Sequence, residues 1–150
     1  MNFWPVLPVT VVVAVLFWSY RKTQERSRQI RDYGQELGFR LLGEDLPLDI
    51  DLKSSSISNV SSVWNVIDGT PRGVRIVAFD CRVGQGKGSW ETTVIAVNAE
   101  PIAVKASDFD MSLEKEHIDG WTLLFHGIGP EFNGGCKMSS EELKGYLEAI

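Results

Sequence analysis

The chain begins with an apolar stretch, residues 3–20, that contains no charged side chain. Eighteen residues of α-helix span about 27 Å, which is close to the thickness of the hydrocarbon layer of a bilayer. Trp4 lies near the start of the stretch, and Trp18 and Tyr20 lie at its end, where aromatic rings favour the headgroup level. The pattern therefore predicts a transmembrane helix over residues 3–20, with the lipid bilayer as its partner.

Two other interpretations of this stretch make demands that its residues do not meet. A cleaved signal peptide has basic residues before its apolar run and small residues after it, whereas this run is preceded by Met1 and Asn2 and ends in bulky aromatic residues. A buried helix without a polar stripe needs a larger protein around it than the remaining 130 or so residues supply. A membrane span fits the residues better than either.

Basic residues follow the apolar stretch and none precedes it. They are Arg21, Lys22, Arg26, Arg28 and Arg31. The positive-inside rule then places the rest of the chain in the cytoplasm, and these bases are explained as a topology signal and as contacts with lipid headgroups. Residues 21–38 are predicted to continue the helix, with Ile30, Tyr33 and Leu37 on one face, Gly34 as a weak point and Gly38 as the stop.

The remainder of the chain is acidic. Of the 20 acidic and 15 basic side chains, 19 and 10 fall in residues 32–150, so we expect no binding of nucleic acid through bulk charge. With 150 residues and 43% hydrophobic content, the chain is predicted to form one domain around one modest core, residues 39–150, with a flexible Ser-rich segment at 53–62.

Alternating apolar residues and turn formers predict an antiparallel sheet. The expected strands are residues 39–42, 63–67, 74–83, 90–97, 102–106 and 121–126. Ser139 and Glu142 form a capping-box pattern before an amphipathic C-terminal helix. The predicted fold class is α+β: an antiparallel meander of about five or six strands with the C-terminal helix packed on it, and closure into a barrel is left open. In the strand at 74–83, the face of Val77, Phe79 and Cys81 is the expected core face.

Candidate chemical residues are few, and each has a simpler structural explanation. Residues 84–89 combine glycines, Lys87 and Ser89, but they lie between two strands, so a hairpin tip is expected rather than a phosphate loop. Cys81 is expected in the core, and Cys136 is expected to be a more accessible free thiol. Their spacing does not match a zinc site.

The two histidines and two of the aspartates have simple structural explanations too. His117 lies in a charged run, predicted to be a solvated turn or edge, and His126 ends a strand. Asp108 and Asp110 flank an aromatic residue and are expected at a surface turn rather than at a cation site. We therefore predict no catalytic residue, no metal site and no cofactor.

Several sequence segments together resemble one protein family. They are NVIDG from Asn65, Gly73 with Val74, VAFDCRVGQGKGSWETTVIAV from Val77, DGWTLLFHG from Asp119, and a helix ending at Ile150. The pattern is similar to a family of uncharacterised bacterial single-pass membrane-anchored proteins with a small soluble domain. The resemblance implies a bacterial inner-membrane protein and carries no activity.

The sequence thus favours a membrane-anchored interaction or ligand-binding module whose domain meets cytosolic or membrane protein partners. Two alternatives remain. One is a membrane-tethered hydrolase or transferase that uses His126 or Cys136, and the other is a structural subunit of an envelope complex.

Overall fold

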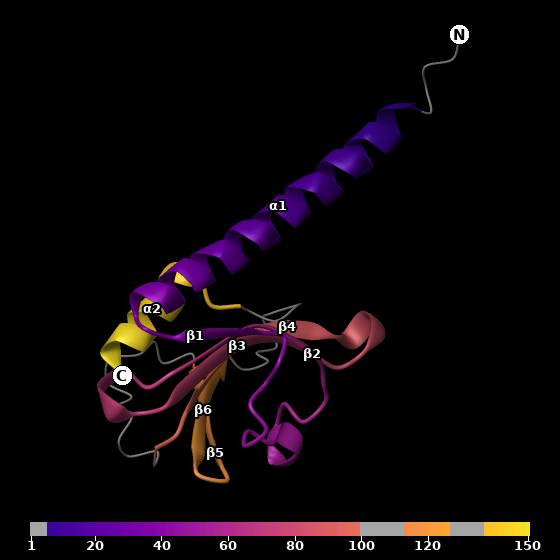
Figure 1. Ribbon diagram of the computed structural model, residues 1–150. Coiled ribbons are helices and arrows are strands. Elements are labelled where there is room, and N and C mark those ends of the chain that lie inside the picture. The colour runs from indigo at the N-terminus through magenta and orange to yellow at the C-terminus, as the bar shows by residue number, and fades with distance from the viewer. Residues whose placement is uncertain (1–5, 100–112, 127–136) are drawn as a thin grey trace.

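The computed structural model describes residues 6–99, 113–126 and 137–150, and in these ranges it is an α+β fold (Figure 1). One long helix, α1, rises from a six-stranded antiparallel sheet, and a short helix, α2, lies beside the base of α1. The helices and strands are α1 (Val6–Glu36), β1 (Arg40–Gly43), β2 (Val60–Gly69), β3 (Ile76–Val83), β4 (Trp90–Val97), β5 (Leu113–Ile118), β6 (Trp121–His126) and α2 (Ser140–Ala149). Three short 3₁₀ helices are η1 (Leu52–Ser54), η2 (Pro71–Gly73) and η3 (Gly86–Gly88).

The strand order is β1-β2-β3-β4-β6-β5, and every pair is antiparallel. The first four strands form the predicted meander, and the C-terminal helix begins at the predicted capping box of Ser139 and Glu142. The sheet is open among the described strands, with β1 and β5 at its edges. β5 was not predicted as a strand. It is an edge strand paired with β6, and β6 pairs with β4. The strand predicted at 102–106 lies outside the described residues.

Both faces of the sheet are buried: the face of Val77, Phe79 and Cys81 is a core face, as predicted, and the opposite face, which was not expected in the core, is buried as well. Residues 76–81 of β3 are all buried, because one face packs against the helices and the other against the β1–β2 connection. The helix-side cluster is Ile30, Phe39, Ile67, Ile76, Ala78, Ile95, Val97, Leu124, Met138, Leu143, Tyr146 and Leu147. The opposite cluster is Ile50, Leu52, Ile57, Val66, Val77, Phe79, Cys81, Val83, Val94, Ala96, Ile118, Trp121, Leu123 and Phe125.

The β1–β2 connection covers the face of the sheet that lies away from the helices. Leu52 and Ile57 are buried in that cluster. The 3₁₀ turn η1, which begins at Leu52, is capped by Asp51, whose side chain accepts a hydrogen bond from the Lys53 amide at 3.0 Å. β2 begins at Val60. The segment 53–62, predicted as a flexible connection, therefore contains part of a 3₁₀ turn, a buried isoleucine and the first residues of a strand.

The helix α1 runs without a break from the predicted span into the segment 21–38, as the sequence predicted. It also continues through Gly34. It ends in a Schellman motif: Phe39 N–H donates to Gly34 O at 2.7 Å, and Gly38 adopts a positive φ of 78°. Gly34 is a packing residue rather than a weak point, because a Cβ there would lie 3.3 Å from Ile67 Cγ2. The last three turns of α1 are thus part of the core.

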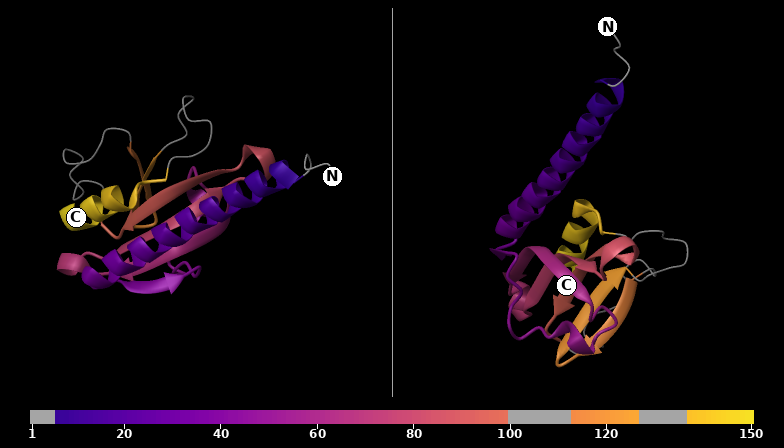
Figure 2. Two further views of the ribbon diagram at one scale, coloured as in Figure 1. Left: turned by 90° about the horizontal axis from the view of Figure 1, so that it is seen from above. Right: turned by 90° about the vertical axis from the view of Figure 1, so that its right-hand side faces the viewer.

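The first half of α1 stands clear of the sheet and of α2 (Figures 1 and 2). Its described apolar side chains from Val9 to Tyr20 are exposed, with fractional exposures of 56–67%. Over the residues that the structure describes, no helix combines the length and the apolar content needed to cross a membrane. The predicted span begins at Phe3, and residues 3–5 lie outside the described part.

Candidate functional site

Among the described residues, Asp80 on β3 stands out as a fully buried carboxylate. The side chain of Asp80 has no exposed surface, and it is paired with Arg26 from the middle of α1. The pairing is bidentate: Arg26 Nε donates to Asp80 Oδ2 at 2.9 Å, and Arg26 Nη2 donates to Asp80 Oδ1 at 2.8 Å. Arg26 also donates through Nη1 to the carbonyl of Met138, just before α2. One side chain of α1 therefore ties the helix to the sheet and to the segment that leads into α2.

Neighbouring strands complete the hydrogen bonds of this carboxylate. Thr93 stands opposite Asp80 on β4 and donates its hydroxyl to Oδ1 at 2.7 Å. Asn65 donates its amide to Oδ2 at 2.9 Å. Asn65 lies at a register shift in β2 and has a positive φ of 56°, a conformation that asparagine tolerates better than most residues. The irregularity in β2 lies at the residue whose amide contacts Asp80.

The carboxylate of Asp80 is held in its ionised form. Burial alone would raise its pKa. The hydrogen bonds and positive charge of Arg26, together with the hydrogen bonds from Thr93 and Asn65, outweigh burial and lower the pKa below its usual value. Its two oxygens accept four hydrogen bonds from these three side chains. The group is thus saturated with donors, which suits a buried clamp between α1 and the sheet rather than a base that exchanges protons.

A groove of about 910 Å³ lies above this clamp, between α1 and the segment that leads into α2. Its lining is mixed: Trp18, Lys22, Glu25, Arg26 and Lys137 contribute a ring and charges of both signs, and hydroxyl groups lie between them. The groove is an open hollow bordered by two helices, and the Arg26 guanidinium contributes to its wall.

Lys137, at one end of the groove, is fixed by two contacts. Its ammonium lies 5.0 Å from the centre of the Trp64 ring and 2.5 Å from Glu91 Oε2. Glu91 also pairs with Arg82 at 2.6 Å. Burial acts to raise the pKa of Glu91, but hydrogen bonds from Lys137 and Arg82 outweigh it and lower the pKa. One carboxylate is therefore shared by two cations.

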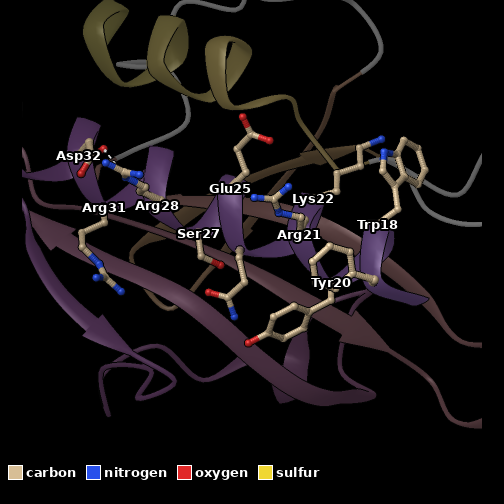
Figure 3. Close-up of a pocket in the computed structure, with 11 residues that line it drawn as sticks. Trp18, Tyr20, Arg21, Lys22, Glu25, Ser27, Arg28, Arg31 and Asp32 are labelled. Carbon is tan, nitrogen blue, oxygen red and sulfur yellow. Dashed lines mark ion pairs between the residues drawn. The ribbon is translucent and has the colours of Figure 1, made fainter. Parts of the chain in front are cut away.

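A second hollow follows the outer surface of α1 itself (Figure 3), and all of its lining residues come from that helix. Figure 3 shows side chains such as Trp18 and Arg31 pointing to different sides. Arg21 and Lys22 lie over the rings of Phe17 and Trp18, four residues earlier, at 5.5 and 5.6 Å. This hollow is an irregular helix surface with cations above aromatic rings, and it cannot enclose a ligand.

The histidines considered in the sequence lie on the β5–β6 hairpin. His117 Nδ1 is 3.4 Å from the Thr122 hydroxyl across the two strands, and His126 Nε2 is 3.1 Å from Glu142 Oε1 on α2. Neither histidine lines the two hollows described above. The charged run around His117 belongs to an edge strand, β5, in agreement with the expected edge position.

The other candidates divide between the core, a hairpin tip and the parts of the chain outside the described residues. Cys81 is a buried free thiol, as predicted, and burial with the nearby Asp80 carboxylate raises its pKa to about 12. Residues 84–89 form the predicted tip between β3 and β4, with Gly84 and Gly86 at positive φ. Cys136, Asp108 and Asp110 lie outside the described residues. Within the described ranges, no group of three or more histidine, cysteine or acidic side chains is arranged to hold a metal.

Sequence reasoning missed the clamp. Arg26 was grouped with four other bases as a lipid-facing charge, yet its side chain is only 16% exposed. The available signal was Asp80, an acid in the middle of a strand that follows two apolar residues, Ile76 and Ala78, on the same face, with Arg82 next on that face. A charged residue at such a position needs a buried partner of opposite sign.

Comparison with known proteins adds no relative: no family model, curated protein or solved structure matches the chain.

Proposed function

We propose that this protein is a membrane-anchored interaction or ligand-binding module. Residues 3–20 lie in a bacterial inner membrane, and the α+β domain lies on the cytoplasmic side. The observation that supports this best is the division of α1 into an exposed apolar half and a half that packs into the domain core.

The exposed half of α1 requires an apolar environment around its side chains. Its apolar side chains are Val9, Val11, Val12, Val13, Val15, Leu16, Phe17, Trp18 and Tyr20, which lie all around the helix rather than on one stripe. A helix that is apolar on all sides favours a surrounding apolar medium over a partner that covers a single face. A lipid bilayer supplies that medium, and the aromatic and basic residues that follow suit its headgroup level.

The packed half of α1 makes the anchor and the domain one rigid unit. Arg26, Ile30 and Gly34 lie on successive turns and contact the buried carboxylate, the helix-side cluster and Ile67, respectively. A domain held in this way keeps a fixed height and orientation at the membrane. Such fixed placement suits a module that meets membrane proteins or ligands close to the bilayer.

Membrane insertion is tested with the full chain and a charge placed in the span. After alkaline carbonate washing, we expect the native protein to stay with membranes and the Val13→Asp variant to be released, because a central aspartate costs about 3 kcal/mol in a transmembrane helix. Leu48→Asp is the matched control, since Leu48 is fully exposed on the β1–β2 connection. Release of the native chain by carbonate would contradict the anchor.

Orientation is tested in the same preparation. Protease added to intact spheroplasts should leave the domain undigested, and it should digest the domain once the inner membrane is opened. Digestion in intact spheroplasts would place the domain in the periplasm instead. Comigration of the full chain with other membrane proteins in mild detergent would favour the alternative of a structural subunit.

A further inference from the structure

The direction of α1 over the sheet sets which part of the domain lies nearest the N-terminal half of the helix. Gly34 of α1 packs on Ile67, which pairs with Ala78 of β3, and Arg26, two turns earlier, binds Asp80. Going backwards along α1 therefore corresponds to going forwards along β3, towards the β3–β4 tip. Figures 1 and 2 show α1 rising towards the end of the sheet that carries this tip, opposite the β2–β3 turn.

The end of β3 lies about as far from the clamp, along the strand, as the start of the exposed half of α1 lies along the helix. From Arg26 back to Tyr20, six residues of helix rise about 9 Å. From Asp80 to Val83, three residues of strand advance about 10 Å. The two advances are similar in length, and Figures 1 and 2 show both running towards the same end of the domain. The tip, with the 3₁₀ turn η3 (Gly86–Gly88), follows directly.

The end of the domain that carries the tip has charges of both signs. The cations there are Lys22, Arg82, Lys87 and Lys137, and Lys87 is exposed at the apex of the tip. Among the acids nearby, Glu91 is shared by Arg82 and Lys137, and Glu25 and Glu141 border the groove.

The exposed acids of the β1–β2 connection lie beyond the opposite face of the sheet (Figure 1). They are Glu44, Asp45, Asp49 and Asp51. Among the described residues, other bases of the domain lie elsewhere, as Arg72 does at the opposite β2–β3 turn, so the tip is distinguished by Lys87, an exposed cation at its apex.

We propose that the β3–β4 tip is a second membrane contact, in which Lys87 rests on the headgroups of anionic phospholipids. This inference depends on the membrane anchor proposed above. Glycines on both sides of Lys87 leave the apex free of bulky side chains, so its ammonium approaches a headgroup layer without obstruction. Together, the anchor and the tip fix the rotation of the domain about the α1 axis as well as its height.

The test uses the full chain in vesicles and a fluorescent label read by quenching from nitroxide-bearing headgroups. Labels are attached to single cysteines at Gln85→Cys on the tip, Gln24→Cys on α1 and Leu48→Cys on the far connection, each with Cys136→Ser. Cys81 is left in place, because its buried thiol has a pKa of about 12 and escapes labelling. In vesicles of phosphatidylcholine with phosphatidylglycerol, we expect strong quenching at positions 24 and 85 and little at 48.

The charge of the tip is tested by Lys87→Gln in the Gln85→Cys chain. One lysine near an anionic surface changes binding about fivefold, so the contact constant at the tip should fall by about that factor while quenching at position 24 is unchanged. In vesicles of phosphatidylcholine alone, the native tip should behave like the variant.

The outcomes separate the two proposals. Failure of the chain to float with vesicles would overturn the anchor itself. Flotation with quenching at position 24, but no more at 85 than at 48, would overturn the tip contact alone. Equal quenching at 85 with and without anionic lipid would also overturn it, because the contact would not depend on charge.

Discussion

Arg26 and Asp80 show how much one buried pair contributes to this architecture. Asp80→Asn keeps the shape of the side chain but leaves the Arg26 guanidinium without its counter-charge at a largely buried position. We expect a loss of about 3 kcal/mol in the free energy of unfolding, the range found when one partner of a buried pair is removed. Denaturant unfolding of the full chain in mild detergent measures it.

The matched control for that variant is Arg28→Ala, which removes an exposed pair with Asp32 at 3.9 Å. Its effect should stay below about 1 kcal/mol, because water screens such pairs. Equal losses for Asp80→Asn and Arg28→Ala would contradict a clamp at Asp80.

The same carboxylate gives the fold a defined pH dependence. The pKa of Asp80 in the folded state is lowered, so as the pH falls the unfolded chain binds this proton first, near its ordinary pKa of about 3.9. The stability that the charge confers is complete above that value and is lost below it. The difference in unfolding free energy between the native chain and Asp80→Asn should be constant above about pH 5 and shrink at lower pH. A difference that grows on acidification would contradict the sign.

Gly69 must lack a side chain because the ring of Phe39 packs against it. A Cβ at this position would lie 2.7 Å from the ring of Phe39, which is itself buried beneath the end of α1. Gly69→Ala should therefore destabilise the fold by about 1–3 kcal/mol through overpacking. Gly145→Ala is the control, because Gly145 is helical with nothing within 4 Å, and it should stabilise by about 0.5–1 kcal/mol. Thermal unfolding of both variants tests the contrast.

At the level of elements, the β1–β2 connection acts as a layer of the core. Ile57 is 1% exposed and packs on the face of the sheet opposite the helices. Ile57→Ala should cost about 2–4 kcal/mol, as is usual for truncation of a buried aliphatic side chain. Leu48→Ala, in the same connection but fully exposed, should leave stability unchanged. If unfolding experiments show no loss for Ile57→Ala, the connection does not contribute to the core.

Sequence patterns predicted the elements well where the local signal was strong. The strand at residues 90–97, the strand at 121–126 and the capped C-terminal helix match the structure, because each strand carries a run of β-branched or apolar residues and the helix carries its own capping pair. β5 was missed because its middle residues are charged, and its strand conformation depends on pairing with β6. The cover formed by residues 44–59 was missed because Ile57 is surrounded by serines, and only tertiary packing shows it to be buried.

At the level of the whole molecule, the division of α1 was the hardest feature to predict. Local sequence indicates a helix from the apolar stretch to Gly38 and correctly gives it one continuous axis. It does not show that Arg26 turns inward while Arg28 and Arg31 stay exposed, since that depends on an aspartate 54 residues away. The clamp and the groove above it therefore needed the fold, whereas the apolar half and its basic flank were evident in the sequence.

The structure shows that the unit expected to fold independently includes the second half of α1 as well as the sheet and α2. Ile30 is 2% exposed and belongs to the helix-side cluster, so a fragment of residues 40–150 lacks part of its core and the partner of Asp80. We expect residues 21–150 to unfold cooperatively with a near-ultraviolet dichroism spectrum typical of fixed aromatic side chains. Residues 40–150 should lose that spectrum or melt at a much lower temperature, because Asp80 then remains buried without Arg26. A fragment of residues 40–150 that is as stable as 21–150 would show that α1 only rests on the domain, and the rigid link between anchor and sheet would be lost with it.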